Sequence, residues 1–185
     1  MVYILLGAGF EEAEALVTAD VLRRAEIPTA LAGIGGKRAA GSHGIVVEAD
    51  LPVEAVTLKA GDMVVLPGGM GGVASIEGSG AAMELVRRAA ADPGLWLAAI
   101  CAAPTLLARA GVLSKGARCV CYPGMESELS DAGAVPAMDL PTVTEGRLIT
   151  GKGPGAVFDF GLALVEALAG PDAAAQVRAG LHYGV

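Results

Sequence analysis

Short runs of aliphatic residues alternate along this chain with longer stretches in which apolar side chains recur at helical spacing. The short runs predict buried strands at residues 2–6, 29–34, 62–66, 95–100 and 117–121, and a short edge strand at 44–49. The longer stretches predict helices at residues 11–25, 81–91, 102–110 and 156–168, and a hairpin is predicted at 142–150. Continuous apolar strands separated by helices are typical of a parallel sheet covered on both faces, so we predict a doubly wound α/β fold.

The predicted topology also indicates where a functional site should lie. In sheets of this kind, ligands bind outside the carboxyl ends of the strands. We therefore expect functional residues in the loops that follow Leu6, Leu66, Ile100 and Cys121.

Composition and charge narrow the classes of protein that fit. A chain of 185 residues that is 54% hydrophobic can build one core, since domains of roughly 100–200 residues are the usual unit. We expect a single domain over residues 1–185 with no linker or repeat. The net charge of −7 repels phosphate backbones and anionic lipids, so neither nucleic acid nor a membrane is an expected partner.

Targeting and redox signals are consistent with a cytoplasmic location. The first apolar run has no basic segment before it and stops at Gly7, so a signal peptide is not expected. The longest strongly apolar stretch, residues 95–108, is shorter than the about 20 residues of a spanning helix and contains Pro104. Three cysteines, an odd number, argue against a disulfide framework.

Two features that suggest a cofactor or a metal do not survive inspection. Gly7-Ala-Gly9 after the first strand looks like the start of a dinucleotide fingerprint. The position where that fingerprint needs its third glycine holds Glu12, however, and an acidic side chain there repels a pyrophosphate. Cys119 and Cys121 share one face of a strand and are expected to be small core thiols. The sequence therefore predicts neither an organic cofactor nor a bound metal.

Cys101 is the strongest candidate for chemistry. It stands between the apolar run 95–100 and a predicted helix, with small residues on both sides and Pro104 in the first helical turn. This is the arrangement of a nucleophile elbow. Unpaired N–H groups at a helix start stabilise a thiolate, so we expect a lowered pKa for this thiol. The competing interpretation is one more buried core thiol.

Separated motifs give this chain a resemblance to a known family. The motifs, in chain order, are Glu11-Glu-Ala-Glu14, Leu-Pro67-Gly-Gly69, Ala-Ala-Ile-Cys101-Ala-Ala-Pro, and Gly153-Pro-Gly155 leading into Phe158-Asp-Phe-Gly-Leu. Together they resemble the ThiJ/PfpI superfamily, and within it the DJ-one branch that holds the parkinsonism-associated deglycase. The resemblance runs nearly from end to end and implies a flavodoxin-like three-layer sandwich that forms a homodimer.

The resemblance also implies roles for individual residues. Cys101 matches the oxidisable nucleophile of the family, and Glu14 matches a protonated carboxyl that hydrogen-bonds the sulfur. The backbone N–H groups of Gly69 and Ala102 fall where the family places an oxyanion hole, with Gly68 as an auxiliary residue. Outside this set, Arg24 and His43 align loosely with dimer-contact residues near the site, although a plain surface role fits them equally well.

Departures from the family pattern affect the expected activity. The protease-like branches carry a histidine directly after the cysteine, where this chain has Ala102, so we do not expect a peptidase. The DJ-one branch often has a histidine near the nucleophile where this chain has Tyr122, a phenol that can donate a hydrogen bond but is a poor base. An amidotransferase-like hydrolase is disfavoured because the catalytic histidine is absent.

Two functional hypotheses follow. In the first, Cys101 and Glu14 form a cofactor-independent glyoxalase or deglycase whose substrate is a small reactive carbonyl, such as methylglyoxal or an early glycation adduct. In the second, Cys101 is an oxidisable redox sensor without turnover, with the nearby carboxyl stabilising a sulfinate.

Overall fold

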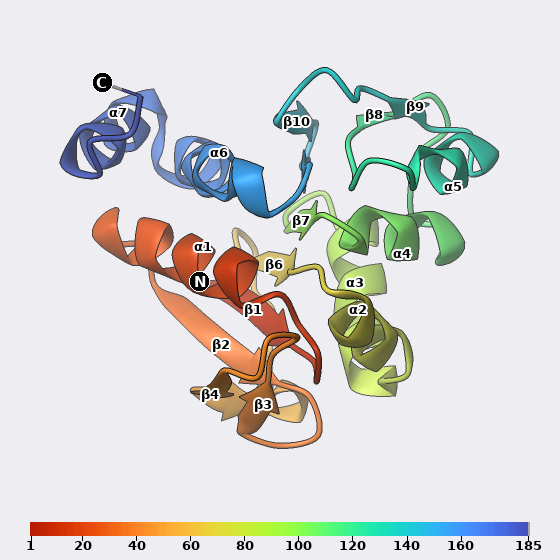
Figure 1. The fold of residues 1–185 in the computed structure, drawn as a ribbon, viewed down its shortest axis with the longest axis horizontal. Helices are drawn as coiled ribbons and strands as arrows, with labels where there is room; N and C mark the ends of the chain where they lie inside the picture. The colour runs from red at the N-terminus through yellow and green to blue at the C-terminus, as the bar shows by residue number, and fades with distance from the viewer. Residues whose placement is uncertain (185) are drawn as a thin grey trace.

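A seven-stranded sheet forms the centre of the structure, a computed structural model that describes residues 1–184 (Figure 1). Its strand order is β10-β11-β7-β6-β1-β2-β5, and all neighbouring pairs are parallel except β10 and β11. The strands are β1 (Val2–Leu6), β2 (Thr29–Gly33), β5 (Leu51–Pro52), β6 (Met63–Leu66), β7 (Trp96–Ile100), β10 (Thr142–Glu145) and β11 (Leu148–Gly151). The predicted flavodoxin-like α/β class is confirmed.

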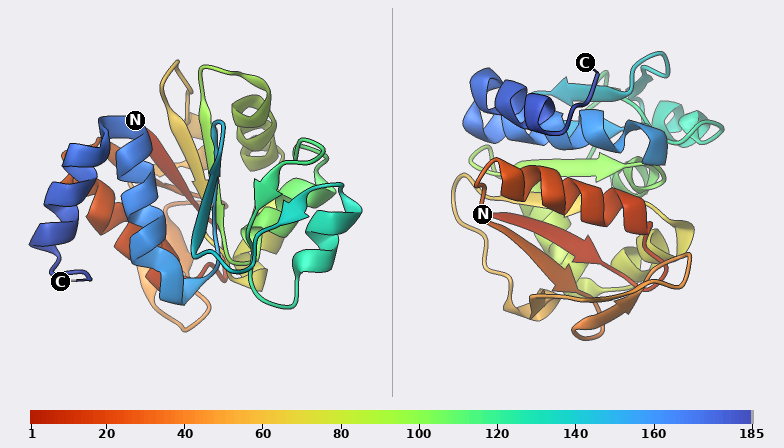
Figure 2. Two further views of the ribbon diagram at one scale, coloured as in Figure 1. Left: turned by 90° about the horizontal axis from the view of Figure 1, so that it is seen from above. Right: turned by 60° about the vertical axis from the view of Figure 1, so that its left-hand side comes forward.

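Helices cover both faces of this sheet (Figure 2). On one face lie α1 (Glu12–Arg24), α6 (Val157–Ala169) and α7 (Pro171–Gly180). On the other face lie α2 (Met70–Glu77), α3 (Gly80–Ala91) and α4 (Ala103–Arg109), with α5 (Glu126–Asp131) beyond them. Within residues 1–184, none of the helices combines the length and apolarity that crossing a lipid bilayer requires.

Strands β1, β6 and β7 are buried almost completely because helices pack on both of their faces. This explains their continuous aliphatic sequences, which the pattern analysis used to predict them. The core between the layers contains large side chains such as Phe10 and Phe160, both fully buried.

Two small sheets lie outside the central one. The first pairs β3 (Arg38–Ala40) with β4 (Val46–Glu48), so the strand predicted at 44–49 belongs to a hairpin and not to the edge of the main sheet. The second pairs β8 (Arg118–Cys119) with β9 (Val135–Pro136), which makes the predicted strand 117–121 shorter than expected. Two short 3-10 segments, Val53–Ala55 and Pro154–Ala156, complete the elements.

Helix α2 was not predicted, because the sequence that starts it is rich in glycine. The glycines are needed for packing: a Cβ on Gly72 would lie 2.6 Å from Phe10 Cα, and one on Gly71 would lie 3.1 Å from Gly9 Cα. Tertiary packing therefore overrides low helix propensity. Helices α5 and α7 were also not predicted, since each has only one buried residue, Leu129 and Val177 respectively, and no apolar stripe.

The close approach at Gly72 gives a first prediction. Gly72→Ala forces a methyl group against the Phe10 backbone, and we expect a loss of about 1–3 kcal/mol in the free energy of unfolding. Denaturant titration measures this loss. Gly80→Ala is the matched control, because nothing lies within 4 Å of a Cβ there, and it should be neutral or stabilising by up to about 1 kcal/mol. Equal stability of the two variants would contradict this packing argument.

Candidate active site

Cys101 occupies a strained turn between β7 and α4. Its φ of 64° lies in the left-handed region, which residues with a side chain rarely adopt. Hydrogen bonds on both sides hold it there: the Cys101 N–H donates to Gly151 O at 2.9 Å, and the Tyr122 N–H donates to Cys101 O at 2.8 Å. Strain of this kind persists where the surroundings over-determine the backbone, and it is common at functional sites. The geometry is that of a nucleophile elbow.

Two backbone N–H groups face the sulfur of Cys101, those of Ala102 and Gly69. Ala102 immediately precedes α4, and Gly69 immediately precedes α2. The position of Gly69 requires glycine, because its φ is 80° and a Cβ would lie 2.4 Å from Gly9 O. The structure thus brings the predicted donors together at the predicted nucleophile.

Glu14 approaches the sulfur from α1. Its side chain is 1% exposed, its Oε2 accepts a hydrogen bond from the Gly68 N–H at 2.6 Å, and its carboxyl group hydrogen-bonds the Cys101 thiol. Gly68 makes this contact possible: a Cβ on it would lie 2.7 Å from Glu14 Oε2 and 2.6 Å from Cys101 Cβ. Gly68, expected as an auxiliary residue, therefore leaves the space that the Glu14 and Cys101 side chains occupy, and no side chain fits at its position.

The ionisation of this pair differs from the sequence-based expectation. Burial raises the pKa of Glu14 to about 7, although the hydrogen bonds from Gly68 and Cys101 oppose this. Burial and the Glu14 carboxylate together raise the pKa of Cys101 to about 12, against the lowering effect of the Ala102 and Gly69 N–H groups. The expectation of a lowered thiol pKa is therefore wrong, because a partner charge and desolvation outweigh two backbone donors.

A raised pKa on both groups means that they titrate as a unit. Between about pH 7 and pH 12 the pair holds a single proton, which lies on the Cys101 sulfur beside the Glu14 carboxylate and can pass between them. Glu14 Oε1 is buried and has no hydrogen-bond partner among the described residues. This unpaired oxygen helps to keep the pKa of Glu14 high, because a buried oxygen without a partner is less costly on a neutral carboxyl than on a carboxylate.

An open pocket of about 430 Å³ lies over this pair. It is lined by Glu11, His43, Gly69, Met70, Cys101, Ala102, Tyr122, Met125 and Pro154. The loops after β1, β6, β7 and β8 all contribute, as the strand topology predicted. Cys101 is 8% exposed and lines this pocket, so a small molecule can reach it there.

Tyr122 forms one wall of the pocket and is 48% exposed. Its ring packs near Gly153, where a Cβ would come within 3.3 Å of Tyr122 Cδ2. A second cavity of about 400 Å³ lies on the other side of the same tyrosine and of Pro154. Tyr122 and Pro154 therefore line both the reactive pocket and a neighbouring cavity that Lys152 also lines.

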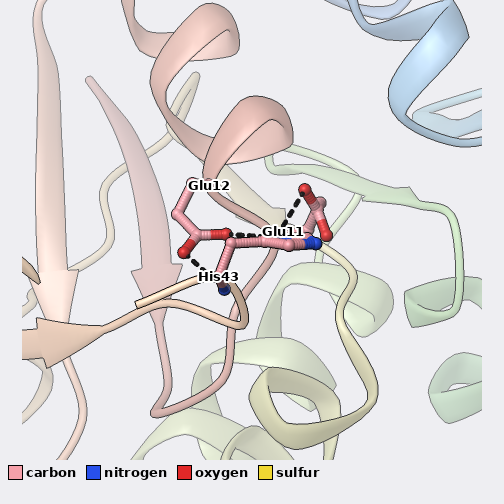
Figure 3. A group of neighbouring side chains, drawn as sticks. All are labelled: Glu11, Glu12 and His43. Carbon is pink, nitrogen blue, oxygen red and sulfur yellow. Dashed lines mark hydrogen bonds and ion pairs between the residues drawn. The ribbon is translucent and has the colours of Figure 1, made fainter. Parts of the chain in front are cut away.

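A charged cluster of Glu11, Glu12 and His43 stands at the pocket rim (Figure 3). His43 Nδ1 lies 3.0 Å from Glu12 Oε2 and 3.6 Å from Glu11 Oε1, and these partners raise the pKa of His43. Burial alone would raise the pKa of Glu12, but hydrogen bonds from the His43 side chain and from the N–H groups of His43 and Ile45 lower it to about 2.

The cluster has ligand types that suit a divalent cation, since the three side chains offer atoms within 4.8 Å of one another. Glu12, however, already accepts hydrogen bonds from Ser42 Oγ and from the backbone of His43. These hydrogen bonds already use the Glu12 carboxylate to hold the loop between β3 and β4. Sequence reasoning missed Glu12, because a first-turn acid carries no signal that distinguishes it from a helix-dipole partner.

Three further residues of the sequence analysis lie outside the pocket. Arg24 pairs with Asp20 Oδ2 at 2.8 Å at the far end of α1, about 15 Å along the helix axis from Glu14. The expectation that Arg24 lies near the site is therefore wrong for a single subunit. Its role in a dimer contact stays a prediction. Cys119 and Cys121 are fully buried with Leu129 in a small separate core, as expected for core thiols.

Comparisons with known proteins identify relatives that cover most of this chain. The model of the DJ-1/PfpI family matches residues 1–167. The Drosophila melanogaster protein dj-1beta is 39% identical over 179 residues, which cover 96% of this chain and 94% of that protein. The glutathione-independent glyoxalase DJR-1.2 of Caenorhabditis elegans is 32% identical over 162 residues, covering 88% of this chain and 84% of that one.

A solved structure extends the likeness to three dimensions. The crystal structure of Drosophila melanogaster DJ-1beta matches 100% of this chain and 98% of its own, with a TM-score of 0.91 and 35% identity. Fold and elbow together define a flavodoxin-like protein built around a cysteine at a strand–helix turn. The chain belongs to the DJ-1/PfpI family.

The shared proton predicts how Cys101 alkylation depends on pH. The rate with a small haloacetamide should rise through about pH 7 and then level off, because the first proton leaves the pair in that range. In Glu14→Gln the inflection near pH 7 should disappear, and the rate should rise only at alkaline pH. Mass spectrometry of the Cys101 peptide measures the rate, and a wild-type profile like that of a free thiol would contradict the shared-proton argument.

The raised pKa of Glu14 also predicts a pH-dependent stability. The folded protein holds a proton on Glu14 up to about pH 7, whereas an unfolded glutamate loses it near pH 4.3, so this stabilisation is full below that value and disappears as pH rises through 7. Glu14→Gln should therefore be more stable than wild type at pH 8.5, by roughly 1–3 kcal/mol. At pH 4 the difference should vanish. Urea unfolding at both pH values tests this, and a constant difference would refute it.

Proposed function

We propose that this protein is a cofactor-independent glyoxalase or deglycase that acts on methylglyoxal or on early glycation adducts. The observation that supports it most is the contact between Cys101 and a buried carboxyl group whose pKa is about 7. A group with this pKa can accept and return protons at neutral pH, which a dicarbonyl rearrangement requires several times. The name of the nematode relative, a glutathione-independent glyoxalase, supports the same activity.

In the first step, the Cys101 sulfur forms a bond to the aldehyde carbon, C1, of the substrate. The thiol proton passes to the Glu14 carboxylate, and the electron pair of the C=O bond moves onto the aldehyde oxygen. The N–H groups of Gly69 and Ala102, which face the sulfur, stabilise the negative charge on that oxygen. Glu14 then returns the proton to the oxygen, which gives a hemithioacetal.

In the second step, Glu14 removes the proton from C1 and delivers it to the neighbouring carbon, C2. The proton of the C1 hydroxyl group moves to the oxygen on C2, so a 2-hydroxyacyl thioester of Cys101 results. Water then cleaves the thioester, releases the 2-hydroxy acid and restores the thiol. The sum is a dicarbonyl plus one water giving lactate from methylglyoxal, or glycolate from glyoxal, with no external oxidant or reductant.

Tyr122 contributes to this scheme as a donor and not as a base. It borders the pocket, and its own backbone N–H already supports the Cys101 carbonyl. Its phenol is well suited to orient a substrate oxygen. Glu14 alone then carries the proton transfers.

A redox sensor remains the second candidate, because the same surroundings suit an oxidised sulfur. Two equivalents of peroxide would add two oxygens to Cys101, each peroxide being reduced to water, and the Glu14 carboxyl would donate a hydrogen bond to the sulfinate. In this case oxidation, and not turnover, is the output of the site.

Activity measurements decide between the two candidates. The variants are purified from a host that lacks other glyoxalases. Cys101→Ser should no longer consume methylglyoxal. Glu14→Ala should have a kcat about 10²–10⁴-fold lower, as expected after loss of a general acid–base group. Cys119→Ser is the matched control, since Cys119 is buried outside the pocket, and it should keep wild-type activity.

Unchanged rates in the first two variants would overturn the enzyme proposal. Negligible wild-type turnover, combined with two added oxygens on Cys101 after mild peroxide treatment, would establish the redox candidate instead.

A further inference from the structure

The two N–H groups that face Cys101 come from two different helices. Gly69 precedes α2 and Ala102 precedes α4, so the relative position of these helices sets the distance between the donors. The same two helices are joined at their other ends. Glu77 is the last residue of α2, and Arg109 is the last residue of α4.

Arg109 makes a forked contact with Glu77. Its Nε lies 3.1 Å from Glu77 Oε1, and its Nη2 lies 3.1 Å from Glu77 Oε2. The remaining nitrogen, Nη1, donates to Glu128 Oε2 of α5 at 2.7 Å. A bidentate guanidinium–carboxylate pair fixes orientation as well as distance, which a lysine cannot do. One side chain therefore joins the last residues of α2 and α4 to α5.

A second path runs from Arg109 back to the elbow. Arg109 Nη1 also donates to Thr105 Oγ1 at 3.0 Å, and that hydroxyl donates to Ala102 O at 2.8 Å. Thr105 is fully buried, and its bond to Ala102 O is buried as well. The acceptor carbonyl belongs to the residue whose N–H faces the sulfur. Arg109 thus connects to one donor through Thr105 and to the other donor along α2.

We propose that Arg109 is a positioning residue, which holds the Gly69 and Ala102 N–H groups at the separation that the Cys101 sulfur and the substrate oxyanion require. The inference rests on the proposed function for the oxyanion part, but the effect on the sulfur does not depend on it. Helix α2 is short, and its second and third residues are Gly71 and Gly72, so few side chains in its first turn fix its orientation.

The alternative is a surface ion pair of no consequence, and exposed pairs often contribute little to stability. Arg109, Glu77 and Glu128 are all partly exposed, so a large change in stability is not expected on substitution. The test must therefore measure geometry at Cys101. Arg109→Lys keeps the charge and removes the fork, and Arg23→Lys is the matched control, because Arg23 forms a surface pair with Asp50 away from the pocket.

For Arg109→Lys we expect the alkylation rate of Cys101 at pH 7 to fall about three- to tenfold, because looser donors stabilise the thiolate less. With methylglyoxal we expect kcat to fall about tenfold with KM nearly unchanged, which is less than the 10²–10³-fold loss of a complete oxyanion donor. Glu77→Gln can still accept hydrogen bonds and should show a smaller decrease. Arg23→Lys should match wild type in every measurement.

The outcomes separate this inference from the proposed function. A reduced alkylation rate in Arg109→Lys, in a protein without glyoxalase turnover, supports the positioning role and rejects the enzyme. Wild-type alkylation and wild-type kcat in Arg109→Lys would overturn the positioning role and leave the enzyme intact. Equal decreases in Arg109→Lys and Arg23→Lys would also overturn it, since they would reflect a general loss of surface ion pairs.

Discussion

The site depends on one buried proton held between Glu14 and Cys101. Neither group can ionise freely, because burial disfavours a charge on each and a charge on one disfavours a charge on the other. The surrounding fold supplies what the pair needs: a carboxyl group from α1, two backbone donors, and a strained turn that presents the sulfur. Because burial raises the pKa of Glu14 to about 7, this carboxyl group can both accept and donate a proton near neutral pH.

Glycine is the means by which these parts come so close together. Gly68 lets both the Glu14 carboxyl group and the Cys101 side chain pack against its backbone, and Gly69 fits against the backbone of the loop after β1. Gly72 then allows α2 to pack directly on Phe10. The site is therefore assembled from backbone contacts, which explains how a chain with so few aromatic residues forms a well-defined pocket.

The sequence predicted the parallel sheet, the elbow and the identity of its residues, because aliphatic strands and a cysteine before a helix are local patterns. It failed where the outcome depends on tertiary contact. Helix α2 is hidden by its glycines, and Glu12 resembles any first-turn acid until the loop at His43 is seen wrapped around it. The pKa of Cys101 was predicted in the wrong direction, since the depth of burial and the charge of a carboxyl brought from α1 cannot be read from neighbouring residues.

The region from β8 to β9 has its own small core of Cys119, Cys121, Leu129 and Ala134. Among its links to the main sheet are the bond from Tyr122 N–H to the Cys101 carbonyl and the bond from Val120 N–H to Thr150 Oγ1 at 3.0 Å. Both of these links use backbone N–H groups of this region, so neither depends on the side chain at Tyr122 or Val120. The Tyr122 ring, which borders the pocket, can therefore be exchanged for another side chain without losing the bond that holds the Cys101 carbonyl.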